Sequence, residues 1–190
     1  LRKFTAFSFQ LNMGNPLFLN NIILFYDKNF KQELKQEWYG QLDTSFAMNP
    51  QIIHNHNTKQ EEIFLQDKNY KIYLFSTNGE KLWEKQIDEE ILGSVSQIDF
   101  YKNKKLQILF NTKNKLYIID RLGRWVESYP KNLAFEATNG HTLFDYEKNR
   151  NYRILIASKD GMLYNFDKRA KEISGWKFKA NNTKLTEQLK

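Results

Sequence analysis

Residues 71–84 read KIYLFSTNGEKLWE, in which two short apolar runs flank an Asn-Gly turn. Related segments occur twice more, at 115–125 and 162–176. Tyrosines mark the first run of each segment, at intervals of 44 and 47 residues: Tyr73, Tyr117 and Tyr164. Tryptophans recur at intervals of 45, 42 and 51 residues: Trp38, Trp83, Trp125 and Trp176. These intervals predict a chain built from a repeat of about 45 residues.

Each repeat contains four predicted strands. Before the runs at 71–75, 115–120 and 162–167 comes another apolar run, at 62–66, 106–110 and 152–156. A less apolar run precedes that one, at 50–54, 96–100 and 142–146. Ile, Leu, Phe and Tyr fill the runs, Asn, Gly, Asp and Lys fill the turns, and there is little helical periodicity. The sequence predicts an all-β fold.

Burial on both faces distinguishes these strands from those of a half-exposed sheet. Runs such as 63–65 and 116–119 are apolar at consecutive positions, whereas a sheet with one wet face alternates. Four-stranded sheets that are covered on both sides are typical of a β-propeller, whose blades stack around an axis. The first strand of each blade would line the channel, and the tryptophan of the outermost strand would pack between blades. A sandwich would not explain the tryptophan interval, and a solenoid has shorter repeats.

The predicted fold is therefore a β-propeller segment of about four blades, one incomplete and three with four antiparallel strands each. The partial blade covers about 1–42, with strands expected at 4–12, 17–26 and 34–40. The complete blades cover 43–89, 90–132 and 133–180, and residues 181–190 form a polar tail. Two alternatives stay open, because most propellers close with about six to eight blades although four are permitted. The chain is a fragment whose uncovered blade faces favour dimerisation, or it is a closed four-bladed ring.

The aromatic strand, the Asn-Gly turn and the terminal tryptophan of residues 71–84 resemble the repeat of the PQQ-like/WD40-like β-propeller family. Residues 61–179 are also similar to the C-terminal repeat region of large uncharacterised Bacteroidota envelope proteins. The resemblance implies a scaffold in the periplasm or cell envelope. Two features depart from the family pattern: Ala170 stands in a turn where glycine is usual, and extra residues separate Tyr26 from Trp38.

Composition excludes several classes of protein. The 190 residues include no cysteine, which excludes disulfide scaffolds, thiolate zinc sites and cysteine catalysis. No apolar run approaches the length of a membrane span. The formal net charge is +7, and the densest lysine runs, at 102–105 and 113–115, fall at predicted turns. We interpret these lysines as solvating the turns, and we expect no nucleic-acid partner.

Few residues of the sequence have the spacing of a catalytic, metal-binding or phosphate-binding site. His54 and His56 would share a strand face, but two ligands are too few for a closed zinc site, and His141 lies in another repeat. The turns after Asp99 and Asp145 lack the glycine and the alternating carboxylates of a calcium loop. There is no nucleophile elbow and no glycine-rich phosphate loop. The sequence therefore predicts no catalytic, cofactor-binding or metal-binding residues and no cofactor, and it assigns the repeated aromatic residues a structural role.

The preferred functional hypothesis is a non-catalytic propeller scaffold that mediates protein–protein interaction, as part of a larger bacterial envelope protein. The alternative is a quinoprotein-like or carbohydrate-binding propeller with a ligand on the channel or loop face. A quinoprotein would need inward-pointing acids, for which Asp99 and Asp145 are the repeated candidates. A carbohydrate site would need solvent-facing aromatic side chains among Trp38, Tyr39 and Trp125.

Overall fold

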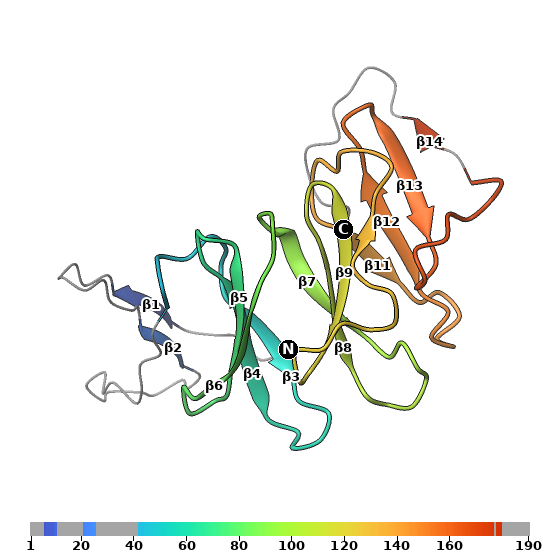
Figure 1. Ribbon diagram of the computed structural model, residues 1–190. Helices are drawn as coiled ribbons and strands as arrows, with labels where there is room; N and C mark the ends of the chain where they lie inside the picture. Colours follow the sequence, from blue (N-terminus) through green and yellow to red (C-terminus); the bar gives the residue numbers. More distant parts are fainter. Residues whose placement is uncertain (1–5, 11–20, 26–41, 177, 180–190) are drawn as a thin grey trace.

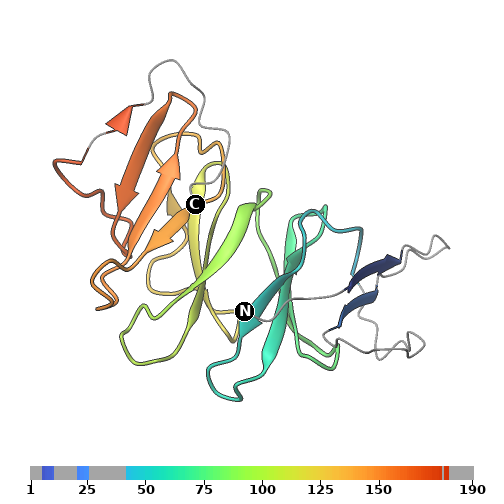
Figure 2. The same ribbon diagram turned by 180° about the vertical axis from the view of Figure 1, so that it is seen from behind.

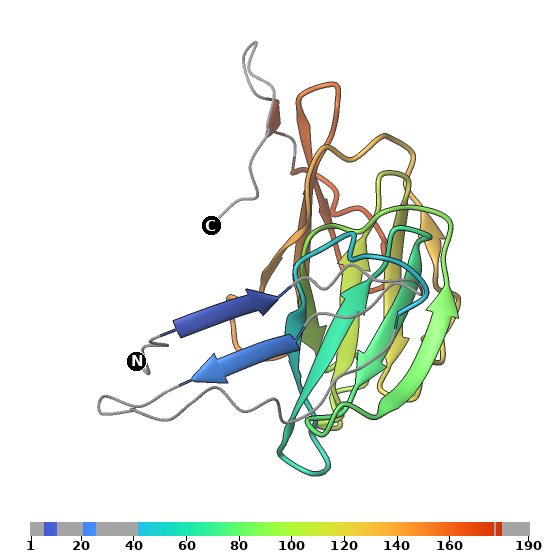
Figure 3. The same cartoon turned by 90° about the vertical axis from the view of Figure 1, so that its left-hand side faces the viewer.

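The computed structural model describes residues 6–10, 21–25, 42–176 and 178–179, and these residues form strands and connecting loops without a helix. The prediction of an all-β fold is confirmed. The first two strands, β1 (Ala6–Gln10) and β2 (Asn21–Phe25), pair antiparallel in a two-stranded sheet (Figure 3). They fall in the predicted partial blade, whose expected third strand at 34–40 lies outside the described residues.

Three four-stranded antiparallel sheets follow, and in each of them strands that are consecutive in the chain are neighbours. The first contains β3 (Gln51–His54), β4 (Glu61–Gln66), β5 (Lys71–Phe75) and β6 (Lys81–Gln86). The second contains β7 (Leu92–Ile98), β8 (Gln107–Asn111), β9 (Lys115–Asp120) and β10 (Lys131–Asn132). The third contains β11 (Thr142–Phe144), β12 (Arg153–Ala157), β13 (Met162–Phe166) and β14 (Phe178–Lys179). Figures 1 and 2 show the sheets one after another along a curve, like the blades of a propeller.

The second of these sheets is buried on both faces. All five residues of β8 are buried. Ile108 and Phe110 pack with Phe64 of the first sheet, whereas Leu109 between them packs with Ile154 of the third. Each large apolar side chain that is fully buried in this way stabilises the fold by about 1.5–3 kcal/mol. This two-sided burial is the packing that the consecutive apolar runs predict, and the β-propeller prediction is confirmed. We call the interface of the first and second four-stranded sheets the first seam, and that of the second and third sheets the second seam.

The first strands of neighbouring sheets are joined directly. The backbone N–H of His54, at the end of β3, donates to Gln97 Oε1 of β7 at 2.8 Å. Gln97 Nε2 donates in turn to the carbonyl oxygen of His54 at 2.9 Å. The two hydrogen bonds hold β3 and β7 side by side, which is where a propeller places its inner strands.

The outer strands differ more than the sequence suggests. In the first sheet Trp83 lies within β6 and pairs with Leu74, but the outer strands β10 and β14 have only two residues each. Trp125 forms an isolated bridge, after which Tyr129 N donates to Val126 O in a local turn. Pro130 follows, and it has no N–H to extend a strand ladder. The second sheet therefore has its short outer strand after the tryptophan instead of around it.

Candidate functional site

In the second and third sheets, the hairpin turn that connects the third and fourth strands is closed by a carboxylate, whereas Ser76 Oγ closes the equivalent turn of the first sheet. Asp120 Oδ1 accepts hydrogen bonds from the backbone N–H groups of Leu122 at 2.8 Å and Arg124 at 3.0 Å. Asp167 makes the same pair of bonds one sheet later. Ala170 adopts φ 61° where the earlier turn has a glycine at φ 76°, so the turn keeps its shape without glycine. The Oδ1 atoms of Asp120 and Asp167 therefore accept hydrogen bonds from backbone N–H groups of their own turns.

Asp99 and Asp145, the carboxylates that a quinoprotein would need, also accept hydrogen bonds from the backbone of their own loops. Asp99 accepts from the backbone N–H groups of Asn103 at 2.8 Å and Lys104 at 2.7 Å, and it pairs with Arg150 Nε at 3.2 Å. Asp145 Oδ1 accepts from the backbone N–H groups of Asn149 and Arg150. Both side chains thus close the loop between the first and second strands of their sheet.

A pocket opens at the end of the first seam, with a volume of about 290 Å³. Its walls come from three places: the loop after β3, the loop after β7, and the turn between β9 and β10. The residues that matter for its chemistry are the basic and the apolar ones: His56, Lys105, Arg121, Arg124, Tyr101 and Leu122. The pocket therefore combines cations with exposed apolar surface.

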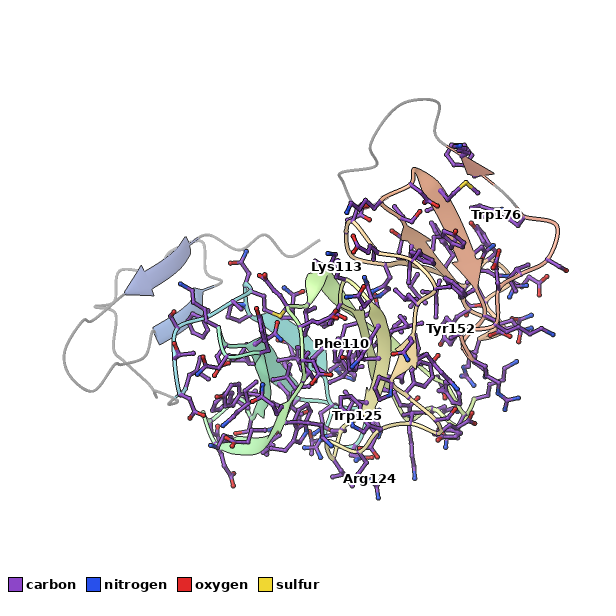
Figure 4. All side chains as sticks on the ribbon, turned by 45° about the horizontal axis from the view of Figure 1, so that its top comes forward. Phe110, Lys113, Arg124, Trp125, Tyr152 and Trp176 are labelled. Atoms are coloured by element: carbon purple, nitrogen blue, oxygen red, sulfur yellow. The ribbon has the colours of Figure 1, made fainter. Side chains whose placement is uncertain are left out.

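A second, larger pocket of about 530 Å³ occupies the same position at the second seam. It is lined by the loop after β7, the loop after β11, and the turn that follows β13. Its basic and aromatic residues are Lys102, Arg153, Lys168, Arg169, Tyr146 and Tyr152. Because both pockets are built from equivalent loops, they open on one end of the stacked sheets. We call this end, formed by residues 55–60, 99–106, 120–124, 145–152 and 167–171, the loop face. The turns at 67–70, 112–114 and 158–161 lie at the other end, the opposite face. Figure 4 shows Arg124 and Lys113 at the two ends of the second sheet.

Positive charge is concentrated at both seams. Burial lowers the pKa of Lys168, and the neighbouring charges of Lys102 and Arg169 lower it further. Burial also lowers the pKa of His56, with Arg121 and Lys105 adding like-charge repulsion. In each pocket, neighbouring cations therefore add to the effect of burial on the pKa of one basic group.

A buried ion pair fixes the first pocket. Glu62 of β4 is only 3% exposed, and its Oε1 accepts from Arg121 Nε at 2.8 Å, Arg121 Nη2 at 2.5 Å and Asn55 Nδ2 at 2.7 Å. The carbonyl oxygen of Arg121 accepts from Trp83 Nε1 at 2.7 Å. Two side chains of the first sheet thereby hold the β9–β10 turn of the second. Sequence reasoning missed this pair, because nothing in a single Glu at a strand start signals a partner 59 residues away.

The repeated tyrosines lie in the third strand of each sheet. Tyr73 and Tyr117 are buried, and Tyr164 is half-buried. Tyr117 stacks on Phe110 with 4.9 Å between ring centroids, and Tyr164 stacks on Phe135 at 3.9 Å. Burial raises the pKa of Tyr117 to about 12. These rings pack against their own and neighbouring chain segments.

The tryptophans are less regular. Trp83 and Trp125 are both half-buried and pack against the core cluster of the first seam. Trp176 packs with Leu155 and Leu163 of the third sheet (Figure 4). Trp38 lies outside the described residues.

The three histidine side chains do not come together in one site. His54 is exposed at the end of β3, whereas His56 lies in the following loop, where its Nδ1 accepts from the backbone N–H of Leu106 at 3.1 Å. His141 is fully buried near Ser96 Oγ, at 2.9 Å from Nε2, and burial lowers its pKa to about 4. Within the described ranges, no three His, Asp or Glu side chains gather as a metal site would require. In the same part of the chain, no helix has the length and apolar character needed to cross a bilayer.

Comparison with known proteins agrees with the fold. The chain is similar to BBS1N in complex with ARL6DN, as solved in crystals soaked with mercury, with a TM-score of 0.58 and 12% identity over 94% of this chain and 52% of that one. For the same complex soaked with lead, the TM-score is 0.51 and the identity 9%, over 68% of this chain and 43% of that one. The chain spans about half the length of these β-propeller structures. No family model and no curated protein matches the sequence.

Proposed function

We propose that this chain is a non-catalytic β-propeller scaffold that binds a protein partner through its loop face. The observation that carries the proposal is the repetition of one pocket at two successive seams, each with arginine and exposed apolar side chains. Tyr101, Leu122 and Tyr146 are 51%, 61% and 72% exposed. Tyrosine and arginine are enriched in protein interfaces, where such residues dominate the binding energy.

The structural likeness supports the same class of function. The similar structure, BBS1N, is a propeller that was crystallised with a protein partner, ARL6DN. Propellers present loops from several blades on one end, so a partner can contact several repeats at once. We further propose that the chain works in the bacterial periplasm or cell envelope, a proposal that rests on the sequence resemblance.

Site-specific photocrosslinking tests the protein-binding proposal. Benzoylphenylalanine replaces Tyr146 on the loop face or, as the matched control, Tyr70, which is 41% exposed on the opposite face. Both full-length variants are irradiated in cells that express the protein. We expect Tyr146→benzoylphenylalanine to give an adduct with one protein, which then binds the purified chain, and Tyr70→benzoylphenylalanine to give none. Equal adducts from both positions, or none from position 146, would contradict the proposal.

A further inference from the structure

The two seam pockets have a charge pattern that defines the chemistry of their ligand. The pocket of the second seam is lined by four cations and two carboxylates: Lys102, Arg153, Lys168 and Arg169 with Glu147 and Asp167. The pocket of the first seam is lined by three cations and one carboxylate: Lys105, Arg121 and Arg124 with Asp120. In both linings, cations outnumber carboxylates, and in the first pocket Arg121 and Arg124 are paired with Glu62 and Asp120, which leaves Lys105 unpaired among the described residues.

The carboxylates in these pockets are already engaged. Asp120 Oδ2 accepts from Arg124 Nε at 2.8 Å, and its Oδ1 closes a turn. Asp167 closes the equivalent turn. Glu147 Oε2 accepts from Asn149 Nδ2 at 2.5 Å. These groups therefore leave cations in the pockets without a negative partner.

Four lysine and arginine side chains carry this excess. Among the described residues, no carboxylate oxygen lies within 4.0 Å of the charged nitrogens of Lys102, Lys105, Arg153 or Lys168. On the opposite face Lys113 pairs with Glu136 at 3.2 Å and Lys115 with Asp88 at 2.5 Å, whereas Lys68 is in none of the ion pairs between described residues. The four unpaired cations named above all line the seam pockets.

Apolar side chains stand beside these cations. Six large hydrophobic side chains of the described residues are exposed, and three of them line the two pockets: Tyr101, Leu122 and Tyr146. Surfaces that combine such residues with arginine match peptides that have both carboxylates and apolar side chains.

Resting on the function proposed above, we propose that the loop face binds an acidic segment of its protein partner. Carboxylates of that segment pair with the cations of both seam pockets, and its apolar side chains lie against Tyr101, Leu122 and Tyr146. A nucleic acid is a poorer match, because its phosphates follow one another at about 1.7 Å of duplex axis per charge. Such a continuous line of charge would meet Glu147, and the remaining carboxylates of the pockets, between the cations.

Fluorescence anisotropy tests the proposal with the full chain. The probe is a fluorescein-labelled peptide of repeating Glu-Asp-Phe units, and the controls are the Gln-Asn-Phe counterpart and labelled single-stranded DNA. We expect the acidic peptide to bind, and its affinity to fall as salt rises, since exposed ion pairs are screened. The double variant K102E/K168E should bind about tenfold more weakly, a loss of about 1.4 kcal/mol. The matched variant K68E/K113E, with the same net charge on the opposite face, should bind as the wild type does.

Lys168 Nζ also donates to the carbonyl oxygen of Phe100 at 2.5 Å. Because the loss of this hydrogen bond in K102E/K168E could itself alter the pocket, a second variant is needed. K105E/R124E changes the other pocket and should weaken the peptide by a similar factor. Binding that is insensitive to both loop-face variants, or DNA binding as tight as peptide binding, would overturn the proposal. If photocrosslinking identifies a partner that contacts the loop face through a neutral segment, the acidic-segment proposal fails and the scaffold proposal stands. If no partner crosslinks, the scaffold proposal itself fails.

Discussion

Removing Arg121 tests whether the buried ion pair holds two blades together. The variant Arg121→Met leaves Glu62, which is 3% exposed, with one of the three hydrogen bonds that its Oε1 now accepts. Breaking a buried pair from one side costs about 3–5 kcal/mol. The Arg121 side chain is 25% exposed, so water partly replaces it, and we expect the lower end, about 3 kcal/mol. That is a large part of the stability of an ordinary domain, about 5–15 kcal/mol.

Urea unfolding followed by tryptophan fluorescence measures this loss. The double variant E62M/R121M should recover most of it, because no buried charge is left unpaired. Arg124→Met is the matched control: Arg124 pairs with Asp120 in the same turn but is 72% exposed, so its loss should cost less than about 1 kcal/mol. If Arg121→Met proves as mild as Arg124→Met, or if the double variant is as unstable as the single one, the pair does not join the blades.

Three further predictions concern the core. Phe110→Ala, at the first seam, should lower the free energy of unfolding by about 3–5 kcal/mol. The control Tyr146→Ala, on the surface, should change it by less than about 0.5 kcal/mol. If urea unfolding gives the two variants the same stability, Phe110 does not pack in the seam. A Cβ on Gly140 would lie 2.6 Å from the carbonyl oxygen of Leu92, so Gly140→Ala should destabilise by about 1–3 kcal/mol or more. A Cβ on Gly175 would meet no atom within 4 Å, and Gly175→Ala is disfavoured only by the backbone φ of 76°. Gly175→Ala should therefore lower the melting temperature less than Gly140→Ala does. The reverse order would contradict the close contact between residue 140 and Leu92. Burial lowers the pKa of His141 to about 4 in the folded state, below the ordinary histidine pKa of 6.5, so the unfolded state takes up a proton first as pH falls. Its stabilising contribution is therefore complete above about pH 6.5 and falls by about 3 kcal/mol towards pH 4. His141→Gln should lack this acid-dependent loss, and parallel stability curves for the variant and the wild type would show that the histidine titrates normally.

The blade architecture could be predicted from the sequence because it depends on local composition. Consecutive apolar residues at 63–65 and 116–119 require cover on both faces, and the structure provides it. The outer strands were harder to predict. Trp83 is on a strand, but Trp125 is followed by a turn and Pro130, so equal spacing in the sequence does not give equal positions in the sheet.

The candidate site could not be predicted, because each pocket combines loops from two blades. Lys102 and Lys105 look like solvated turn residues when they are considered alone. They gain a role only because Lys168 and Arg121 lie across the respective pockets. Glu62 likewise resembles an ordinary polar strand residue, and only the stacking of the sheets reveals Arg121 as its partner. Contacts of this kind depend on how the blades are placed, about which a single sequence carries no signal.

Hydrogen–deuterium exchange of the full chain, with and without the acidic peptide, tests most directly whether the loop face is the binding surface. Bound peptide should slow exchange in 99–106, 120–124, 145–152 and 167–171, which line the two seam pockets. The turns at 67–70 and 112–114, on the opposite face, should exchange at unchanged rates. Protection confined to the opposite face, or no protection under conditions where the peptide is bound, would contradict the assignment of the loop face as the site.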